Sequence, residues 1–308
     1  MRRIAAVLLA VLNLAVSTLP APNPPAPNLA VPNVSAPSLA APNLPAPTVS
    51  APNLTMPSLP ALDMAALNTP VPAPASPPST PDIVGGTPAS AEAHPWLVGL
   101  LDVNGTFFCG GTLASPMKVI TAAHCIGRKQ PADLKVVQGR TQMAGSAGRV
   151  LKVASAWVHP AFRTVIEGDD IAVLTLAEPA FVLPLTVASP QDFLAYWPGL
   201  PATVFGWGRV FDSGPVSTVL LSVAVPLVDD LTCKAAYPSY NPQKMVCAGR
   251  AQGGADACQG DSGGPLVVGD RLIGVVSWGE GCGMPGKPGV YSRVSTYQPL
   301  IRQQLGLS

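Results

Sequence analysis

Short apolar runs rich in β-branched residues, separated by glycine, proline and polar residues, mark the chain from about residue 83 onward. Runs of this length between turn residues are typical of β-strands. The strands that we expect lie at residues 119–121, 135–138, 171–176, 202–205, 266–268 and 272–276. The last segment, residues 296–305, is expected to be helical. The pattern therefore predicts an all-β fold with turn-rich connections and a C-terminal helix.

The N-terminal residues 1–17 have the pattern of a secretory signal peptide. Two arginines follow the first methionine, and residues 4–16 are apolar except for Asn13. Ala15 and Ser17 are small residues at the spacing that a signal peptidase favours, so we expect cleavage after Ser17. The apolar run is too short for a membrane span, which needs about 20 residues.

Residues 18–82 form a proline-rich segment. A five-residue repeat begins at Ala21 and places proline at positions 22, 27, 32, 37, 42, 47, 52 and 57. Proline fixes φ at about −65° and lacks a backbone donor, which disfavours both helices and sheet ladders. We expect an extended spacer or pro-segment. A stalk that binds a cell wall or matrix is the other interpretation.

Composition limits the class of protein. The formal net charge is +1 and no long charged run occurs, so neither nucleic acid nor an anionic membrane is expected as a partner. Residues 83–308 are enough for a sizeable hydrophobic core. All six cysteines lie in this part. An even number of cysteines after a signal peptide indicates an oxidising compartment, and we expect a secreted, extracellular protein.

Three short segments carry candidate chemistry: TAAHC at residues 121–125, DDIAVL at 169–174 and GDSGGP at 260–265. A serine hydroxyl is a weak nucleophile at neutral pH and needs an adjacent base, which histidine can supply. The imidazole in turn needs a carboxylate that fixes its tautomer. Ser262, His124 and Asp170 provide these groups. Asp169 is the competing carboxylate, but Asp170 leads directly into an apolar run and is the better candidate for burial.

Together these segments resemble the trypsin-like serine proteases, and secreted bacterial trypsins most in character. Supporting segments are IVGG at residues 83–86, FGWG at 205–208, MVCAG at 245–249, SWG at 277–279 and KPGVY at 287–291. The resemblance covers residues 83 to about 305. It implies two six-stranded antiparallel barrels in a protease domain of residues 83–308, with His124 and Asp170 in the first barrel and Ser262 in the second.

The resemblance also implies a role for each residue of the site. Ser262 attacks the scissile carbonyl to form an acyl-enzyme, His124 transfers the proton, and Asp170 orients His124 with support from Ser277. The backbone N–H groups of Gly260 and Ser262 form the oxyanion hole. Protein or peptide substrates are the expected partners of a monomer.

Substrate specificity follows from the residue six positions before the nucleophile, which lies at the base of the primary pocket in this family. Here it is Asp256, which predicts cleavage after arginine or lysine. The pocket is further expected to be lined by Ala257, Ser277, Trp278, Gly279 and Gly289. Ala257 replaces a serine that is common in relatives. The missing hydroxyl removes a partner for a lysine ammonium, whereas arginine can still form a bidentate pair, so arginine should be preferred.

The six cysteines allow fifteen pairings by sequence alone. The resemblance selects Cys109–Cys125, Cys233–Cys247 and Cys258–Cys282. Many animal relatives bind calcium in a loop between the histidine and the aspartate. Residues 134–166 contain no aspartate or glutamate, so we expect no metal there, and no cofactor is implied.

Activation departs from the usual pattern of the family, in which a new α-amino group, here that of Ile83, pairs with the aspartate beside the nucleophile, here Asp261. The residue before Ile83 is normally basic but is Asp82 in this chain, and no lysine or arginine occurs in residues 4–117. A protease that cuts after arginine or lysine cannot release Ile83, so we expect a separate activating protease. The alternative to an enzyme is a latent or inactive homologue that acts as an extracellular binding module.

Overall fold

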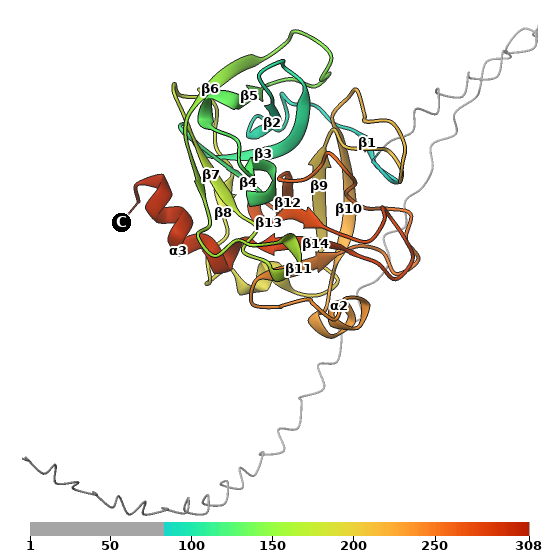
Figure 1. The fold of residues 1–308 in the computed structure, drawn as a ribbon. Helices are drawn as coiled ribbons and strands as arrows, with labels where there is room; N and C mark the ends of the chain where they lie inside the picture. The colour runs from blue at the N-terminus through green and yellow to red at the C-terminus, as the bar shows by residue number, and fades with distance from the viewer. Residues whose placement is uncertain (1–82, 308) are drawn as a thin grey trace, which may run out of the picture. The chain divides into compact units, whose positions relative to one another are not determined.

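The computed structural model describes residues 83–307, and the signal peptide and proline-rich segment expected from the sequence lie outside the described residues. The described part consists of two antiparallel β-barrels (Figure 1). The two-barrel fold that the resemblance implied is thereby confirmed. No helix within residues 83–307 has the length and hydropathy that a membrane crossing requires.

The first barrel is closed and six-stranded, with the order β2-β3-β4-β7-β6-β5, and β2 pairs with both β3 and β5. Its strands are β2 (Leu97–Leu101), β3 (Phe107–Ser115), β4 (Lys118–Thr121), β5 (Lys135–Gln138), β6 (Arg149–Val158) and β7 (Ala172–Leu176). Every residue of β2 is buried, because one face lines the barrel interior and the other is covered by the rest of the fold.

The second barrel has the order β9-β10-β11-β14-β13-β12, and pairing of β12 with β9 closes it. Its strands are β9 (Pro201–Gly206), β10 (Leu221–Val228), β11 (Met245–Ala248), β12 (Pro265–Val268), β13 (Arg271–Trp278) and β14 (Gly289–Arg293). Two short strands extend it, namely β1 (Thr87–Pro88), which pairs with β10, and β8 (Thr186–Val187), which runs parallel to β13.

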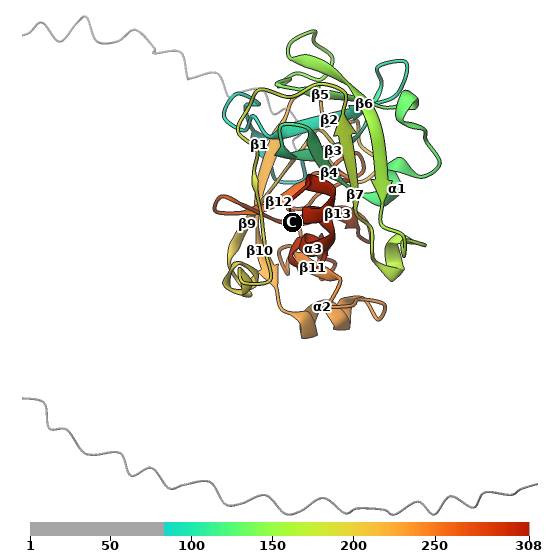
Figure 2. The ribbon, with the colours of Figure 1, turned by 90° about the vertical axis from the view of Figure 1, so that its left-hand side faces the viewer.

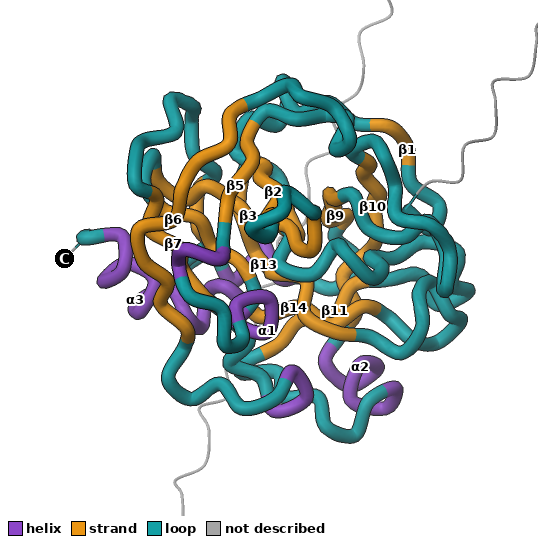
Figure 3. The backbone as a smooth tube through the Cα atoms, turned by 45° about the horizontal axis from the view of Figure 1, so that its top comes forward, coloured by secondary structure: helices purple, strands orange, loops and turns teal. Residues whose placement is uncertain are grey.

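Helices are few in residues 83–307, and strands and loops make up most of this part (Figure 3). They are α1 (Ala123–Ile126), α2 (Asp230–Ala236) and α3 (Val294–Leu305), with short 3-10 turns at Pro131–Asp133, Val165–Glu167 and Phe193–Tyr196. The C-terminal helix starts two residues before the predicted segment and ends where Gly306 adopts a left-handed φ of 73°. Tyr297 and Ile301 of α3 join the same buried cluster as the first-barrel core, so this helix packs between the barrels (Figure 2).

All six predicted strands are present, with ends shifted by at most two residues and β5 unshifted. The pattern missed the short strands β1 and β8, the longer strands β2, β3, β6, β10, β11 and β14, and the helices α1 and α2. The sequence of β3 shows one reason, because it contains Gly110 and Gly111, which weaken a strand when it is judged alone. In the fold, a Cβ at Gly110 would lie 2.9 Å from the Cα of Gly264 in the second barrel. Contact with the second barrel therefore requires glycine at Gly110. The same glycine is one reason why the sequence pattern did not predict β3.

Truncation of a side chain in the first-barrel core should test this architecture. Leu100 in β2 is fully buried, and Leu100→Ala should lower the free energy of unfolding by about 2–5 kcal/mol because it leaves a cavity. The matched control is Val150→Ala in β6, where the side chain is about half exposed and the loss should stay below about 1 kcal/mol. Urea unfolding of both variants measures the difference, and equal losses would contradict the assigned core.

Candidate active site

His124 and Asp170 lie in direct contact at the edge of the first barrel. His124 is held in α1, immediately after β4, and Asp170 comes just before β7. The imidazole Nδ1 lies 2.7 Å from Asp170 Oδ2, and the His124 backbone N–H donates to Oδ1 at 2.9 Å. Because the carboxylate is engaged by both the ring and the backbone of one residue, the ring orientation is fixed and Nε2 points away from it.

The second barrel completes the shell around Asp170. Ser277 Oγ in β13 donates to Asp170 Oδ2 at 2.6 Å, and Ser292 Oγ in β14 donates to the Asp170 backbone carbonyl at 2.7 Å. Asp170 has no exposed surface, so these donors offset the cost of burying its charge. The structure thus places Ser277 where the sequence predicted it, whereas pattern analysis gave no signal for Ser292.

Asp169, the competing carboxylate, faces away from His124. Its Oδ2 lies 2.6 Å from Nζ of Lys244, and its φ of 57° turns the chain so that consecutive aspartates point in different directions. The geometry therefore brings Asp170, and not Asp169, to the histidine.

Ser262 lies in the loop before β12, where the second barrel meets the first. Its backbone carbonyl accepts from the Gly110 N–H at 2.8 Å, and the disulfide sulfur of Cys125 lies 3.6 Å from the same oxygen. Within residues 83–307 the Ser262 hydroxyl makes no hydrogen bond to His124 Nε2. Such contacts are often long in ligand-free sites and tighten when substrate binds.

The glycines around Ser262 allow this close approach. A Cβ at Gly263, whose φ is 79°, would collide with Oγ1 of Thr121 in β4. Gly260 has a φ of 100°, and a Cβ there would lie 3.0 Å from the Cα of Gly208. Among the described residues, no acceptor receives the backbone N–H of Gly260 or Ser262. These two donors are free to bind an oxyanion.

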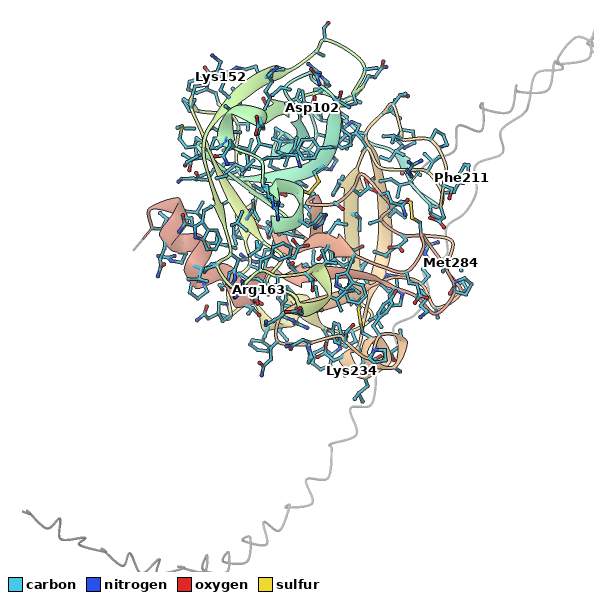
Figure 4. All side chains as sticks on the ribbon, in the orientation of Figure 1. Asp102, Lys152, Arg163, Phe211, Lys234 and Met284 are labelled. Carbon is cyan, nitrogen blue, oxygen red and sulfur yellow. A yellow bond between two sulfur atoms is a disulfide. The ribbon has the colours of Figure 1, made fainter. Side chains whose placement is uncertain are left out.

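A pocket of about 190 Å³ opens beside Ser262. It is lined by Asp256, Ala257, Cys258, Gln259, Ser262, Val276, Ser277, Trp278, Gly279, Gly281, Cys282, Gly289, Val290 and Tyr291. All the predicted pocket residues are among them. Figure 4 shows Phe211 and Met284 on loops at the same side of the described part, and Asp212, next to Phe211, contacts the pocket residue Gln259 and approaches Cys282.

Asp256 lies buried in this pocket with one oxygen unpaired. Its Oδ2 accepts the Gly283 N–H at 3.1 Å, but Oδ1 has no partner among residues 83–307. A Cβ at Gly289 would lie 2.6 Å from Oδ1 and 3.1 Å from the Tyr291 hydroxyl, so glycine keeps the space before the carboxylate open. The Tyr291 hydroxyl is likewise buried and unpaired, and nothing in the sequence pattern indicated it. Burial raises the pKa of Asp256 to about 7.

Ile83 and Asp261, the predicted activation pair, are both fully buried in the second barrel. The Asp261 carboxylate accepts the backbone N–H groups of Gly208 at 2.7 Å and Cys258 at 2.9 Å. Burial nevertheless raises its pKa to about 7, because these two donors offset only part of the lost hydration. The backbone nitrogen of Ile83 is still in the peptide bond to Asp82.

The three disulfides join Cys109 to Cys125, Cys233 to Cys247 and Cys258 to Cys282, the pairs that the resemblance selected. Within the described residues, one group of three metal-ligating side chains occurs, formed by Cys109, His124 and Cys125. Its two sulfurs are bonded to each other, so the group offers a metal only the imidazole.

The raised pKa of Asp256 predicts pH-dependent binding of cations in the pocket. Below about pH 7 the carboxyl is neutral, so affinity for a small arylamidinium ion should fall by up to about tenfold per pH unit as pH decreases. Calorimetry between pH 5.5 and 8.5 measures this, with a neutral aryl amide as ligand control. Asp256→Asn should remove both the affinity and its pH dependence. A wild-type affinity that is constant across this range would contradict the prediction.

Comparisons with known proteins agree with this geometry. The model of the Trypsin family matches residues 83–301. A trypsin of Saccharopolyspora erythraea is 50% identical over 223 residues, covering 72% of this chain and 98% of the relative. Trypsin 5G1 of Aedes aegypti is 40% identical over 229 residues, covering 73% and 85%, and serine protease 56 of Mus musculus is 38% identical over 235 residues, covering 72% and 38%. Because the family model matches most of its length and the relatives are 38–50% identical over about 72% of it, the chain belongs to the trypsin family of serine proteases.

Proposed function

We propose that this serine protease is a secreted endopeptidase that cleaves after arginine or lysine, with arginine preferred, and that it is made as an inactive precursor. The observation that carries the specificity is the unpaired Oδ1 of Asp256 in a narrow pocket beside Ser262. A buried carboxylate without a partner is costly, and a cationic side chain from the substrate would supply the missing partner.

In the proposed mechanism, Ser262 Oγ attacks the scissile carbonyl while His124 Nε2 accepts its proton. The resulting oxyanion is stabilised by the Gly260 and Ser262 N–H groups, each worth about 3 kcal/mol in comparable sites. His124 then protonates the leaving amine, which departs and leaves an acyl-enzyme on Ser262. Water, activated by His124, hydrolyses this ester and restores the serine. Asp170 keeps the Nδ1 proton of His124 in place throughout, which the 2.7 Å contact supports.

The preference for arginine rests on Ala257, whose methyl group lines the pocket in place of a hydroxyl. A lysine ammonium is a short point charge that depends on additional acceptors near the pocket base. A guanidinium presents two parallel donors and can engage the carboxylate directly. The Tyr291 hydroxyl, which lines the same pocket, is another unpaired oxygen in this region.

The domain boundaries and the activation step are part of the same proposal. Residues 1–17 would direct export, residues 18–82 would form the pro-segment or spacer, and residues 83–308 would be the protease. Cleavage between Asp82 and Ile83 would free an α-amino group to pair with Asp261. Because the bond follows an acidic residue, a separate protease of different specificity would make this cut.

The direct test uses protein that begins at Ile83, with disulfides formed, and matched peptide amides ending in arginine, lysine, phenylalanine or alanine. Arginine should give the highest kcat/KM, lysine less, and the neutral residues little; Ser262→Ala should abolish all hydrolysis. Ala257→Ser should raise kcat/KM for lysine relative to arginine by about tenfold or more, since one hydrogen bond to a charge is restored. Lysine activity equal to or above arginine in the wild type would contradict the preference. A folded protein without activity, or with no reaction towards a fluorophosphonate, would favour the latent binding module.

Asp261 should affect stability with opposite sign before and after processing. In the unprocessed chain its pKa is about 7, above its ordinary value, so its ionisation lowers the free energy of unfolding as pH rises from about 4 to 7. Asp261→Asn should flatten this decline. In the processed chain the carboxylate gains the Ile83 ammonium, and the same substitution should cost about 3–5 kcal/mol and abolish activity.

Urea unfolding of both forms at several pH values between 4.5 and 7.5 measures this reversal. Asp256 ionises over the same range in both forms, so the comparison of Asp261→Asn with wild type within each form isolates Asp261. Equal effects of Asp261→Asn in the two forms would contradict the activation pair.

A further inference from the structure

Asp169 is the neighbour of Asp170 along the chain and occupies an unusual position. It is a buried carboxylate with a φ of 57°, a left-handed conformation that non-glycine residues rarely adopt. Such a conformation persists only where the surroundings over-determine it. The contacts of Asp169 therefore indicate what holds the loop that carries Asp170.

Lys244, just before β11 in the second barrel, reaches across to this loop of the first barrel. Its Nζ lies 2.6 Å from Asp169 Oδ2 and 3.4 Å from the Glu167 carbonyl oxygen. A Cβ at Gly168, whose φ is 85°, would lie 3.0 Å from Cδ of Lys244, so the loop lies directly against the lysine stem. The lysine thus contacts three consecutive residues that lead into Asp170.

Tyr297 of α3 holds the same residue from another side. Its hydroxyl accepts the Asp169 N–H at 3.0 Å and lies 3.3 Å from Asp169 Oδ1 and 3.4 Å from the Lys244 carbonyl oxygen. Since Ser292 also binds the Asp170 carbonyl, the Asp169–Asp170 segment is fixed at both residues by the second barrel and the C-terminal helix.

The ion pair also has an electrostatic consequence. Two adjacent buried carboxylates repel, and at an effective dielectric near 20 a unit charge acts over roughly 10 Å with more than 1 kcal/mol. The positive charge of the Lys244 ammonium offsets the negative charge of Asp169. The electrostatic potential at His124 therefore comes mainly from Asp170 and only to a small extent from Asp169.

We propose that Lys244, through its ion pair with Asp169, is a positioning residue that fixes Asp170 behind His124 across the barrel interface and balances the charge beside it. This inference rests on the proposed roles of His124, Asp170 and Ser262. In this proposal the Lys244–Asp169 ion pair supports catalysis although neither residue contacts the substrate or the His124 imidazole.

Within residues 83–307, ionisable groups near the pair include Glu167 and Asp170 on the same loop, Tyr297 on α3 and His159 after β6. His159 meets Tyr297 edge to face, with 5.4 Å between ring centres. Burial lowers the pKa of His159, Asp169 opposes this and Lys244 adds to it. Around His124 itself the charged neighbours are Asp170 and Lys129, whose Nζ binds the Cys125 carbonyl oxygen. A test by pH must therefore separate His124 from His159.

The experiment compares Lys244→Met, Lys244→Arg and Asp169→Asn, each made as the full chain and processed to begin at Ile83. Lys244→Met should lower kcat about tenfold with KM changed less than about twofold, since the loss is in geometry and not in substrate binding. Lys244→Arg should recover most of kcat. The matched control is Arg149→Met, which breaks the exposed Arg149–Glu178 pair of the first barrel and should change nothing.

The pH profile of kcat/KM distinguishes the electrostatic role from a structural one. Lys244→Met leaves Asp169 uncompensated, so the acid limb should move to higher pH by about half a unit, and Asp169→Asn should move it to lower pH. Both shifts should persist when His159→Asn is added. Unchanged kcat in Lys244→Met, or acid limbs that do not move in opposite directions, would overturn the proposal. An inactive wild type would instead contradict the proposed function, and unfolding traces of each variant identify any that fails to fold.

Discussion

Burial of the Asp170 carboxylate between the two barrels is the constraint on which the site depends. A fully buried charge is tolerated only when donors surround it. The first barrel supplies the donors of His124, and the second supplies the hydroxyls of Ser277 and Ser292. Neither barrel alone satisfies the carboxylate. The need to do so fixes how the barrels pack, and this packing sets where the imidazole lies relative to Ser262.

The same interface explains the glycines. The backbone of Gly110 in the first barrel lies against Gly264 in the second, and Gly263 lies against Thr121, so side chains at these positions would force the barrels apart. The loop that carries Ser262 is glycine-rich because it is packed against another barrel. Its positive φ values then leave the N–H groups of Gly260 and Ser262 free of internal acceptors, which is what an oxyanion requires.

Two further buried carboxylates lack a cation in the unprocessed, ligand-free chain. Asp256 and Asp261 both have a pKa of about 7, since burial outweighs the backbone donors that each accepts. Each is thus a site where a cation would gain considerable interaction energy. In the proposed function, the substrate side chain fills one role and the Ile83 ammonium the other. Lys244, by contrast, already neutralises Asp169, so among the buried carboxylates of residues 83–307 the two without a cationic partner are those with proposed functional partners.

The sequence alone determined the family, the serine, histidine and aspartate of the candidate site, and the strands whose β-branched runs stand alone between turns. These follow from local chemistry, because GDSGGP and TAAHC contain the proposed reacting groups and the small residues that they need. The sequence favoured Asp170 over Asp169, and the tertiary structure shows why Asp169 turns away from the histidine, since its left-handed φ is held by Lys244 and Tyr297. Only the tertiary structure shows Ser292 and Tyr291 at the site. The Ser292 hydroxyl binds the Asp170 carbonyl, and the Tyr291 hydroxyl lies near the Asp256 carboxylate, and both partners are distant in sequence. Strands that contain glycine, such as β3, were not predicted for the same reason. Contact with the other barrel requires glycine in them, although glycine lowers the strand propensity of the segment itself.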